Sequence, residues 1–203
     1  MSEQSIPERS APSLLTPELN QFIERFEGKS ISSPLRDASI GTQADTGRWQ
    51  INIAAFSGDE NIQLCVAAWH ALLHWLRYDK EPVITCLLSS DRSRVWPLVS
   101  EIEDDSHLID LHAAICQQWP KFNTDWLNLV ELDNPLFADH LLCHAVCVNG
   151  ITENSQPIAE FELIYDKRSW WINGAKSIFS ETYLLHMRDF WLQLVEQFQK
   201  HPR

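Results

Sequence analysis

The sequence predicts an α/β domain, and three stretches carry that prediction. Residues 181–200 place apolar side chains at three- and four-residue spacing, which draws a stripe along one helix face: Leu184, Met187, Trp191, Leu194, Val195 and Phe198. Two short strands, 161–165 and 169–172, precede that helix. The continuous apolar run 83–88 is typical of a strand buried on both faces of a sheet. A helix with so wide an apolar face needs a sheet to lie on, and we expect the two preceding strands to form its edge.

The other predicted elements extend this pattern along the chain. Ser180 is expected to cap the closing helix, because its hydroxyl can accept hydrogen bonds from the free amides of the first turn. Further helices are predicted to begin after Thr16, Asp59, Ser106 and Thr124, and further strands at residues 49–53, 95–102 and 140–148. This order of helices and strands is an α/β arrangement without an internal repeat.

The chain divides into three predicted segments. Residues 1–14 form a polar leader with two prolines, which we expect to be flexible. Residues 15–58 hold the first helix, a Ser/Gly/Asp-rich loop and the first strand, and residues 59–203 hold the remaining elements. We expect residues 15–203 to form one compact unit, because a chain of 203 residues can bury one sizeable core.

Composition restricts the class of partner. Lys and Arg number 16 against 28 Asp and Glu, a formal charge of −12, which argues against nucleic acid and anionic membranes. No run reaches the ~18 apolar residues of a membrane span, and no N-terminal stretch resembles a signal peptide. The five cysteines show no disulfide spacing and are predicted to be reduced, buried thiols of a cytoplasmic protein. Nine tryptophans exceed the usual need of such a core, so some are expected to face a protein partner.

Several short stretches, in this order, resemble segments of one protein family. The stretch Cys65-Val-Ala-Ala-Trp-His-Ala-Leu-Leu73 is similar to a helix of the form LLAAWALLL, and residues 82–92 to a strand that ends near an arginine. Asn134-Pro-Leu-Phe137 is similar to HPLF, and Phe161-Glu-Leu to FDL. From Asp59 onward the chain thus resembles the C-terminal lobe of the condensation domains of nonribosomal peptide synthetases, which belong to the chloramphenicol-acetyltransferase-like superfamily.

The resemblance implies a single half of a chloramphenicol-acetyltransferase-like fold, with helices packed on a central mixed sheet. The family carries its catalytic signature, His-His-x-x-x-Asp-Gly, in the N-terminal lobe, and this sequence contains no His-His pair. We therefore assign no catalytic, cofactor-binding or metal-binding residue and no cofactor.

Histidines and cysteines were weighed as metal ligands. His70 and His74 have a chelating i, i+4 spacing, but no further ligand accompanies them, so solvated or hydrogen-bonded histidines are the preferred interpretation. Cys143 and Cys147 share one face of the predicted strand 140–148, and His140 and His144 share the other, so the four cannot meet at one ion.

Two polar stretches were weighed in the same way. The stretch Ser89-Ser90-Asp91-Arg92 offers hydroxyls at a strand end, but no base lies nearby in sequence, so a loop is the preferred interpretation. The acidic run 103–105 is predicted to be a solvated helix entry rather than a metal site.

Four residues were selected as partner contacts: Trp170, Trp171, Trp96 and Arg92. Adjacent strand residues face opposite ways, so one of Trp170 and Trp171 should enter the core and the other should meet a helix, solvent or a partner. Core packing is the preferred interpretation of this pair, and a partner hot spot is the alternative.

The resemblance implies a condensation-like lobe without catalysis that docks in nonribosomal peptide biosynthesis, as in the pathways to antibiotics and siderophores. Its expected partner is an adenylation domain or a carrier protein, and a homodimer is a further option. The alternative is an acyltransferase or condensation enzyme that a second chain completes with the catalytic histidine. A binding module outside peptide synthesis is the third hypothesis.

Overall fold

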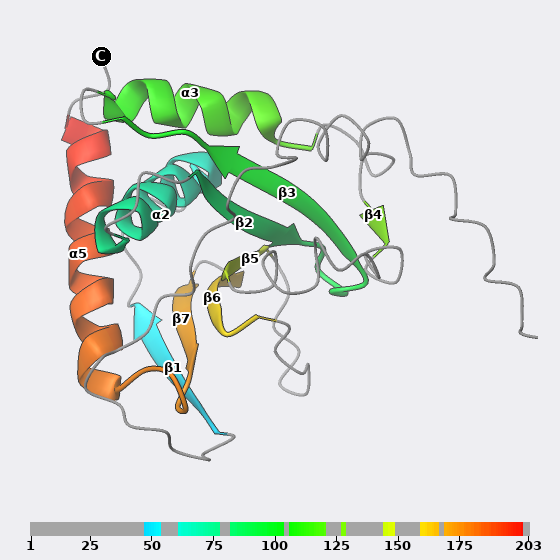
Figure 1. Ribbon diagram of the computed structural model, residues 1–203, viewed down its shortest axis with the longest axis vertical. Coiled ribbons are helices and arrows are strands. Elements are labelled where there is room, and N and C mark those ends of the chain that lie inside the picture. Colours follow the sequence, from blue (N-terminus) through cyan, green and yellow to red (C-terminus); the bar gives the residue numbers. More distant parts are fainter. Residues whose placement is uncertain are drawn as a thin grey trace, which may run out of the picture. The chain divides into compact units, whose positions relative to one another are not determined.

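The computed structural model describes residues 47–53, 61–77, 82–103, 106–120, 127–128, 144–148, 159–166 and 169–200. The chain divides into two units, 1–30 and 31–203, and every described residue belongs to the second. The predicted leader and the helix predicted after Thr16 therefore lie outside the described residues. The described part contains a seven-stranded sheet and three helices, labelled α2, α3 and α5 (Figure 1).

The sheet is mixed, with strand order β1-β7-β6-β5-β2-β3-β4. Its strands are β1 (Arg48–Ile53), β2 (Val83–Leu88), β3 (Arg94–Ser100), β4 (Leu127–Asn128), β5 (His144–Val148), β6 (Phe161–Asp166) and β7 (Ser169–Ala175). The β2–β5 and β5–β6 pairs are parallel, and the other pairs are antiparallel. All six residues of β2 are buried, which confirms the prediction that the run 83–88 is a strand covered on both faces.

The edge of the sheet differs from the prediction. Strands β6 and β7 pair with each other as expected, but both lie inside the sheet, because β1 pairs with the outer side of β7. The register places Ile51 opposite Ile172, so that apolar side chains of both strands face the same side. Sequence periodicity identifies a strand but not its neighbour, which is why β1 was not expected at this edge.

The three helices agree with the predicted stripes, while two of their caps differ. Helix α5 (Glu181–Lys200) has the predicted bounds, and the Tyr183 amide donates to the Ser180 hydroxyl at 3.2 Å. Helix α2 (Ile62–Leu76) is capped by Asn61, whose side chain accepts from the Leu64 amide, whereas Asp59 lies outside the described residues.

Helix α3 begins one residue later than its predicted cap implies. It spans Leu108–Gln118 after His107, and the Ser106 hydroxyl accepts from the Glu103 amide instead of a helix amide. Residues 127–128 form β4, paired with β3, where a short helix after Thr124 was predicted. Strand β3 ends at Ser100, two residues before its predicted end, and the described part of the strand predicted at 140–148 begins at His144.

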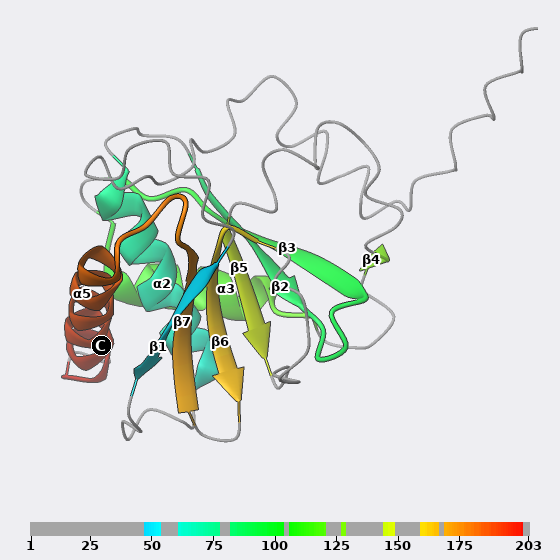
Figure 2. The same ribbon diagram turned by 90° about the horizontal axis from the view of Figure 1, so that it is seen from below.

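The helices lie on one face of the sheet and enclose the main core (Figure 2). Aromatic rings occupy its centre: Trp170 lies 5.3 Å from Trp191 of α5, and Trp69 of α2 lies 4.6 Å from Phe161 of β6, between ring centroids. The Trp191 indole donates to the Cys65 carbonyl oxygen at 3.1 Å, which ties α5 to α2. We call this side of the sheet the helix face.

The other side is buried as well, although no described helix lies on it. We call it the open face of the described fold. Six apolar side chains of its central strands are each at most 3 % exposed: Ile84, Cys86, Leu88, Ala145, Cys147 and Ile164. Among the described residues, no helix is long and apolar enough to cross a membrane.

Candidate functional site

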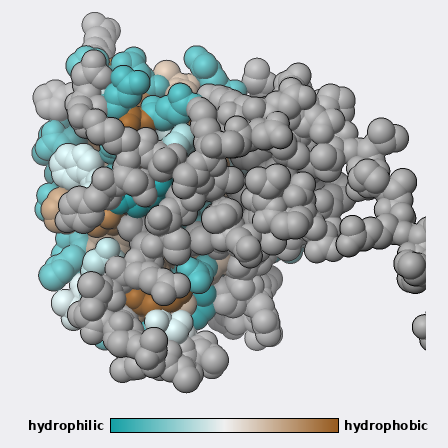
Figure 3. All heavy atoms as spheres, in the orientation of Figure 1, coloured by the Kyte–Doolittle hydropathy of each residue, from teal (hydrophilic) through white to brown (hydrophobic). Residues whose placement is uncertain are grey.

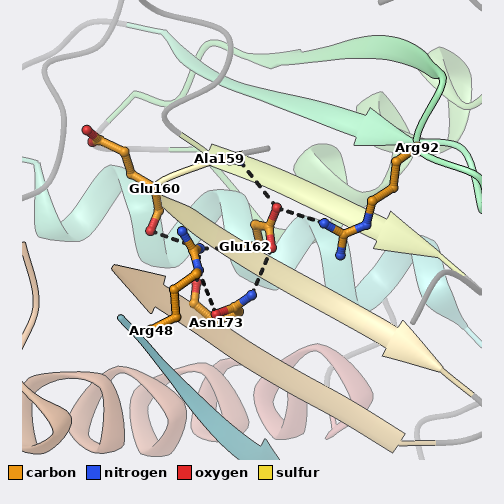
Figure 4. Close-up of polar contacts among 6 residues, drawn as sticks. All are labelled: Arg48, Arg92, Ala159, Glu160, Glu162 and Asn173. Atoms are coloured by element: carbon orange, nitrogen blue, oxygen red, sulfur yellow. Dashed lines mark hydrogen bonds and ion pairs between the residues drawn. The ribbon is translucent and has the colours of Figure 1, made fainter. Parts of the chain in front are cut away.

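A buried carboxylate lies at the middle of the open face. Glu162 of β6 is 0 % exposed, and the register places it between Ala145 of β5 and Asn173 of β7. The Asn173 side-chain amide donates to one Glu162 oxygen at 3.0 Å, and the Ala159 backbone amide donates to the other at 3.3 Å (Figure 4). A charged group so far from water requires such partners, because desolvation alone would cost several kcal/mol.

Two arginines from distant parts of the chain complete this cluster. Arg92, in the turn between β2 and β3, places its guanidinium 3.4 Å from Glu162, and Arg48 of β1 lies 3.9 Å from it. Figure 4 shows the two guanidinium groups approaching Glu162 from different sides. Arg48 also donates to the Asn173 side-chain oxygen at 2.9 Å and to the Glu160 carbonyl oxygen at 3.2 Å. We call Glu162, Arg48, Arg92 and Asn173 the arginine–glutamate cluster.

The cluster is built to hold strands together rather than to react. Burial lowers the pKa of Arg48, and the charge of Glu162 opposes this change. Arg92 has a backbone φ of 57°, in the left-handed region that non-glycine residues seldom adopt. Its amide donates to the Ser89 carbonyl oxygen at 2.8 Å, which closes the turn and directs Arg92 to Glu162. The arrangement joins β1, β6, β7 and the β2–β3 turn through one carboxylate.

The cysteine beside this cluster is not activated. Cys147 is buried, and desolvation raises the pKa of its thiol to about 11, despite an opposing effect of Arg92. The neutral thiol is a poor nucleophile, so Cys147 is a packed side chain at neutral pH.

Two histidines are buried on the helix face. His70 of α2 is hydrogen-bonded at 2.8 Å to each of two hydroxyls, those of Thr85 and Ser100. His144 of β5 is 1 % exposed, and neither of its ring nitrogens has a hydrogen-bond partner among the residues that the structure describes. Burial lowers the pKa of both histidines to about 3, with a further lowering of His70 by His144 and of His144 by Arg77. Both are neutral at physiological pH and closed to solvent.

The hydroxyls of the β2–β3 turn serve the turn itself. The Ser89 hydroxyl donates to the Asp91 carboxylate at 2.5 Å, and the Ser93 hydroxyl donates to the same carboxylate at 2.7 Å. These bonds lower the pKa of Asp91 to about 2. No described histidine is bonded to Ser89, and the predicted loop is what the structure shows.

The structure describes His70, His144 and Cys147 among the candidate metal ligands. His70 is bound to hydroxyls, and His144 and Cys147 face opposite sides of β5, as the strand geometry predicted. Among the described residues, no group of three or more His, Cys, Asp or Glu side chains could hold a metal ion. Cys143, His140 and residues 104–105 lie outside the described part of the chain.

The four residues predicted to contact a partner differ in how far they are buried. Trp170 is 0 % exposed in the core, the position that the preferred interpretation of the pair gives to one of the two tryptophans. Trp171 is half-buried on the open face, and Trp96 is half-buried with its indole donating to the Gln118 carbonyl oxygen at 2.7 Å. Arg92 is 8 % exposed within the arginine–glutamate cluster.

Sequence reasoning missed two features of the site. Glu162 interrupts an otherwise apolar strand, Phe161-Glu-Leu-Ile-Tyr165, and a charge in a buried strand signals a buried partner. That signal was available, although the identity of the partners was not. The second feature is an exposed aromatic pair, Trp75 of α2 and Phe190 of α5, whose ring centroids are 6.5 Å apart in an edge-on arrangement.

This aromatic pair is unusual on the described surface. Trp75 is 66 % exposed and Phe190 is 48 % exposed, whereas the other members of the apolar stripes of α2 and α5 are buried or half-buried. On the face of the molecule drawn in Figure 3, hydrophobic areas over the described residues are small and lie among hydrophilic ones. Paired exposed aromatic side chains are typical of contacts with another protein.

Solved structures share this fold, whereas no protein-family model and no curated protein matches the chain. The epimerization domain from the third module of tyrocidine synthetase B matches with a TM-score of 0.64 at 10 % identity, over 91 % of this chain and 55 % of that one. A mutant starter condensation domain of rhizomide synthetase RzmA matches with a TM-score of 0.61 at 12 % identity, over 91 % and 52 %.

A third match is the X-domain from teicoplanin biosynthesis, in its complex with OxyB. Its TM-score is 0.64 at 11 % identity, over 91 % of this chain and 53 % of that chain. The predicted condensation-type fold is therefore confirmed. The chain spans about half the length of these three structures.

Proposed function

We propose that this chain is a non-catalytic condensation-type lobe that serves as a docking or scaffold element in nonribosomal peptide biosynthesis. It packs on an adenylation domain or a carrier protein of a peptide synthetase. The observation that carries the proposal is a contrast between polar side chains and one aromatic pair. The polar groups of the arginine–glutamate cluster and of the β2–β3 turn are bonded to one another, while Trp75 and Phe190 remain exposed as a pair.

The comparisons support a docking role without defining the partner. All three solved structures come from peptide-forming systems, and one of them, the X-domain, was solved in complex with a second protein, OxyB. His70 and His144 give no support to catalysis, because both are neutral and closed to solvent. A general base must lie within hydrogen-bond reach of the reacting proton.

The test is direct binding between purified proteins. The chain is mixed with the adenylation domain and, separately, with the carrier protein encoded beside it, and affinity is measured by biolayer interferometry. Trp75→Ala and Phe190→Ala are each expected to weaken binding about 30-fold, because a hot-spot side chain contributes about 2 kcal/mol or more. Gln193→Ala, an exposed position one turn from Phe190 on α5, is the matched control and should leave affinity unchanged.

Two results would overturn the docking proposal. One is the absence of binding to both the adenylation domain and the carrier protein; equal binding by the aromatic variants and the control would instead overturn the role of Trp75 and Phe190 in docking. The other is acyl transfer by the purified chain alone, measured by mass spectrometry of acyl-carrier substrates. Thermal unfolding of each variant checks that a weaker interaction does not reflect a damaged fold.

The half-length match favours one alternative. This chain covers 52–55 % of the first two solved structures, so a second polypeptide could supply the missing half, including the catalytic histidine. Such a protein would be an acyltransferase or condensation enzyme made of two chains. Acyl transfer that requires both chains and is abolished by replacing a histidine of the second chain would establish this alternative.

A further inference from the structure

The outer surface of α3 carries two soft metal ligands side by side. His112 and Cys116 are four residues apart, so they lie on the same helix face. The Cys116 sulfur lies 3.4 Å from the His112 Nε2 atom. Cys116 is exposed, unlike Cys65, Cys86 and Cys147, which are buried. Neither side chain takes part in the core, the arginine–glutamate cluster or the aromatic pair.

The separation of the two donor atoms suits a tetrahedral ion. Zinc binds cysteine sulfur at about 2.3 Å and histidine nitrogen at about 2.0–2.1 Å, so a tetrahedral angle of about 109° places the two donors about 3.5 Å apart. The 3.4 Å observed between Sγ and Nε2 corresponds to an angle of about 103° at the same bond lengths. The helix therefore already holds both donors at the spacing that one zinc ion requires.

Binding requires the loss of one proton from each pair. The Cys116 sulfur and the His112 Nε2 atom face each other at 3.4 Å, so an ion that binds both takes the place of the thiol proton. On binding, the thiol releases its proton and the thiolate coordinates the ion.

Two ligands from the described part of one chain leave the ion half coordinated. No third His, Cys, Asp or Glu joins the pair among the described residues. A second copy of the chain, related by a two-fold axis through the ion, would add its own His112 and Cys116. The result is the closed Cys2His2 set of structural zinc sites. Ile109, one turn before His112 and 40 % exposed, would become buried beside the ion in such a contact.

We propose that His112 and Cys116 form half of a zinc-type site that joins two copies of this chain through α3. Two thiolates neutralise the divalent ion, so two protons leave for each ion bound. Each chain carries a formal charge of −12, and this repulsion opposes pairing without the ion. Pairing is therefore metal-dependent and independent of the docking function proposed above.

The experiment uses the full chain, with cobalt as a spectroscopic probe and zinc for assembly. Titration with Co²⁺ should produce thiolate-to-cobalt charge-transfer absorption that saturates at one ion per two chains. Sedimentation velocity should show that Zn²⁺ converts monomer to dimer and that EDTA reverses the change. Cys116→Ser and His112→Ala should each need at least about tenfold more metal, since even the loss of an outer-shell partner costs 10–100-fold in affinity.

The controls separate this site from general metal binding. His186→Ala removes an exposed histidine on α5 and should leave both the titration and the dimer unchanged. Circular dichroism of each variant confirms that α3 is intact. An unchanged cobalt spectrum in Cys116→Ser would overturn the site, and cobalt–thiolate binding by a chain that stays monomeric would overturn the bridge between copies.

Discussion

The two faces of the sheet bury polar groups by different physical means. On the helix face, His70 and His144 are buried in the neutral form. Burial disfavours the charged form of each ring, which lowers the pKa of both histidines. On the open face, Glu162 is buried beside Arg48 and Arg92, and the cost is offset by ion pairs and hydrogen bonds. The helix face should thus respond to pH, whereas the open face should respond to the loss of a partner.

The largest expected effect comes from neutralising the centre of the open face. Glu162→Gln keeps the shape of the side chain but removes the charge that buried Arg92 and half-buried Arg48 share, so we expect a loss of about 3–5 kcal/mol in unfolding free energy. Urea denaturation measures this loss. The matched control is Glu160→Gln, because Glu160 accepts a hydrogen bond from Arg48 through its backbone carbonyl oxygen. Equal losses in the two variants would show that the arginines do not depend on Glu162.

The next effect tests the helix face by acid. Each buried histidine has a folded-state pKa of about 3, below the usual 6.5, so the unfolded chain binds more protons between these values. The free energy of unfolding is therefore at its full value above pH 6.5. Below that pH it falls on acidification by about 1.4 kcal/mol per pH unit for each histidine. Thermal unfolding from pH 7 to pH 5 measures the slope.

A variant sharpens this pH prediction. His144→Leu should remove about half of the slope, because one of the two histidines no longer titrates. The substitution should also lower the free energy of unfolding only slightly at pH 7, because an apolar side chain replaces ring nitrogens that have no hydrogen-bond partners among the described residues. An unchanged slope would mean that protonation elsewhere governs acid sensitivity, and His186→Ala, at an exposed position, should show that unchanged slope.

A smaller effect is expected where β7 meets α5. A Cβ atom added at Gly174 would lie 2.8 Å from a Leu184 methyl carbon and 3.1 Å from the Phe179 ring. Gly174→Ala should cost about 1–3 kcal/mol by overpacking, because Leu184 is fully buried and has little room to move. Urea denaturation of Gly174→Ala and of the double variant Gly174→Ala/Leu184→Val tests this, and partial recovery in the double variant is expected. No recovery would place the cost in the backbone rather than in the Leu184 contact.

The mildest test compares the two faces without changing the sequence. A thiol reagent at neutral pH should label Cys116 in the folded chain, while Cys65 on α2 and Cys86 and Cys147 on the open face stay unlabelled. Peptide mass spectrometry after a brief exposure reads out each site, and labelling in urea supplies the control for complete reaction. Labelling of Cys86 and Cys147 ahead of Cys65 would show that the open face admits solvent more readily than the helix face.

The sequence predicted helices and strands most accurately where one periodic pattern dominated. The stripe of α5 and the apolar run of β2 each have a single interpretation, and both are confirmed. Residues 127–128 were assigned to a helix, although they form a strand against β3, because so short a stretch carries no period. The place of β1 beside β7 was also missed, since pairing between distant strands depends on tertiary contacts.

The site was less predictable than the fold. Arg92 is one of the four predicted partner contacts, and the sequence does not predict that its guanidinium is bound to Glu162. A lone charge such as Glu162 in an apolar strand predicts that a partner exists, but it does not identify residues from β1 and the β2–β3 turn. The exposed pair of Trp75 and Phe190 lies at the borders of two apolar stripes, where helix periodicity alone does not decide between core and surface.

The pairing of β1 with β7 has a consequence for how the protein is made. Arg48 reaches Asn173 across 125 residues, so the edge strand leaves the ribosome long before its partner exists. At about 5–20 residues per second, an apolar segment carrying Ile51 and Ile53 waits roughly 6–25 s for completion of the sheet. During that interval its backbone and side chains are open to wrong pairing, so newly made chains should depend on chaperones more than the mature fold would suggest.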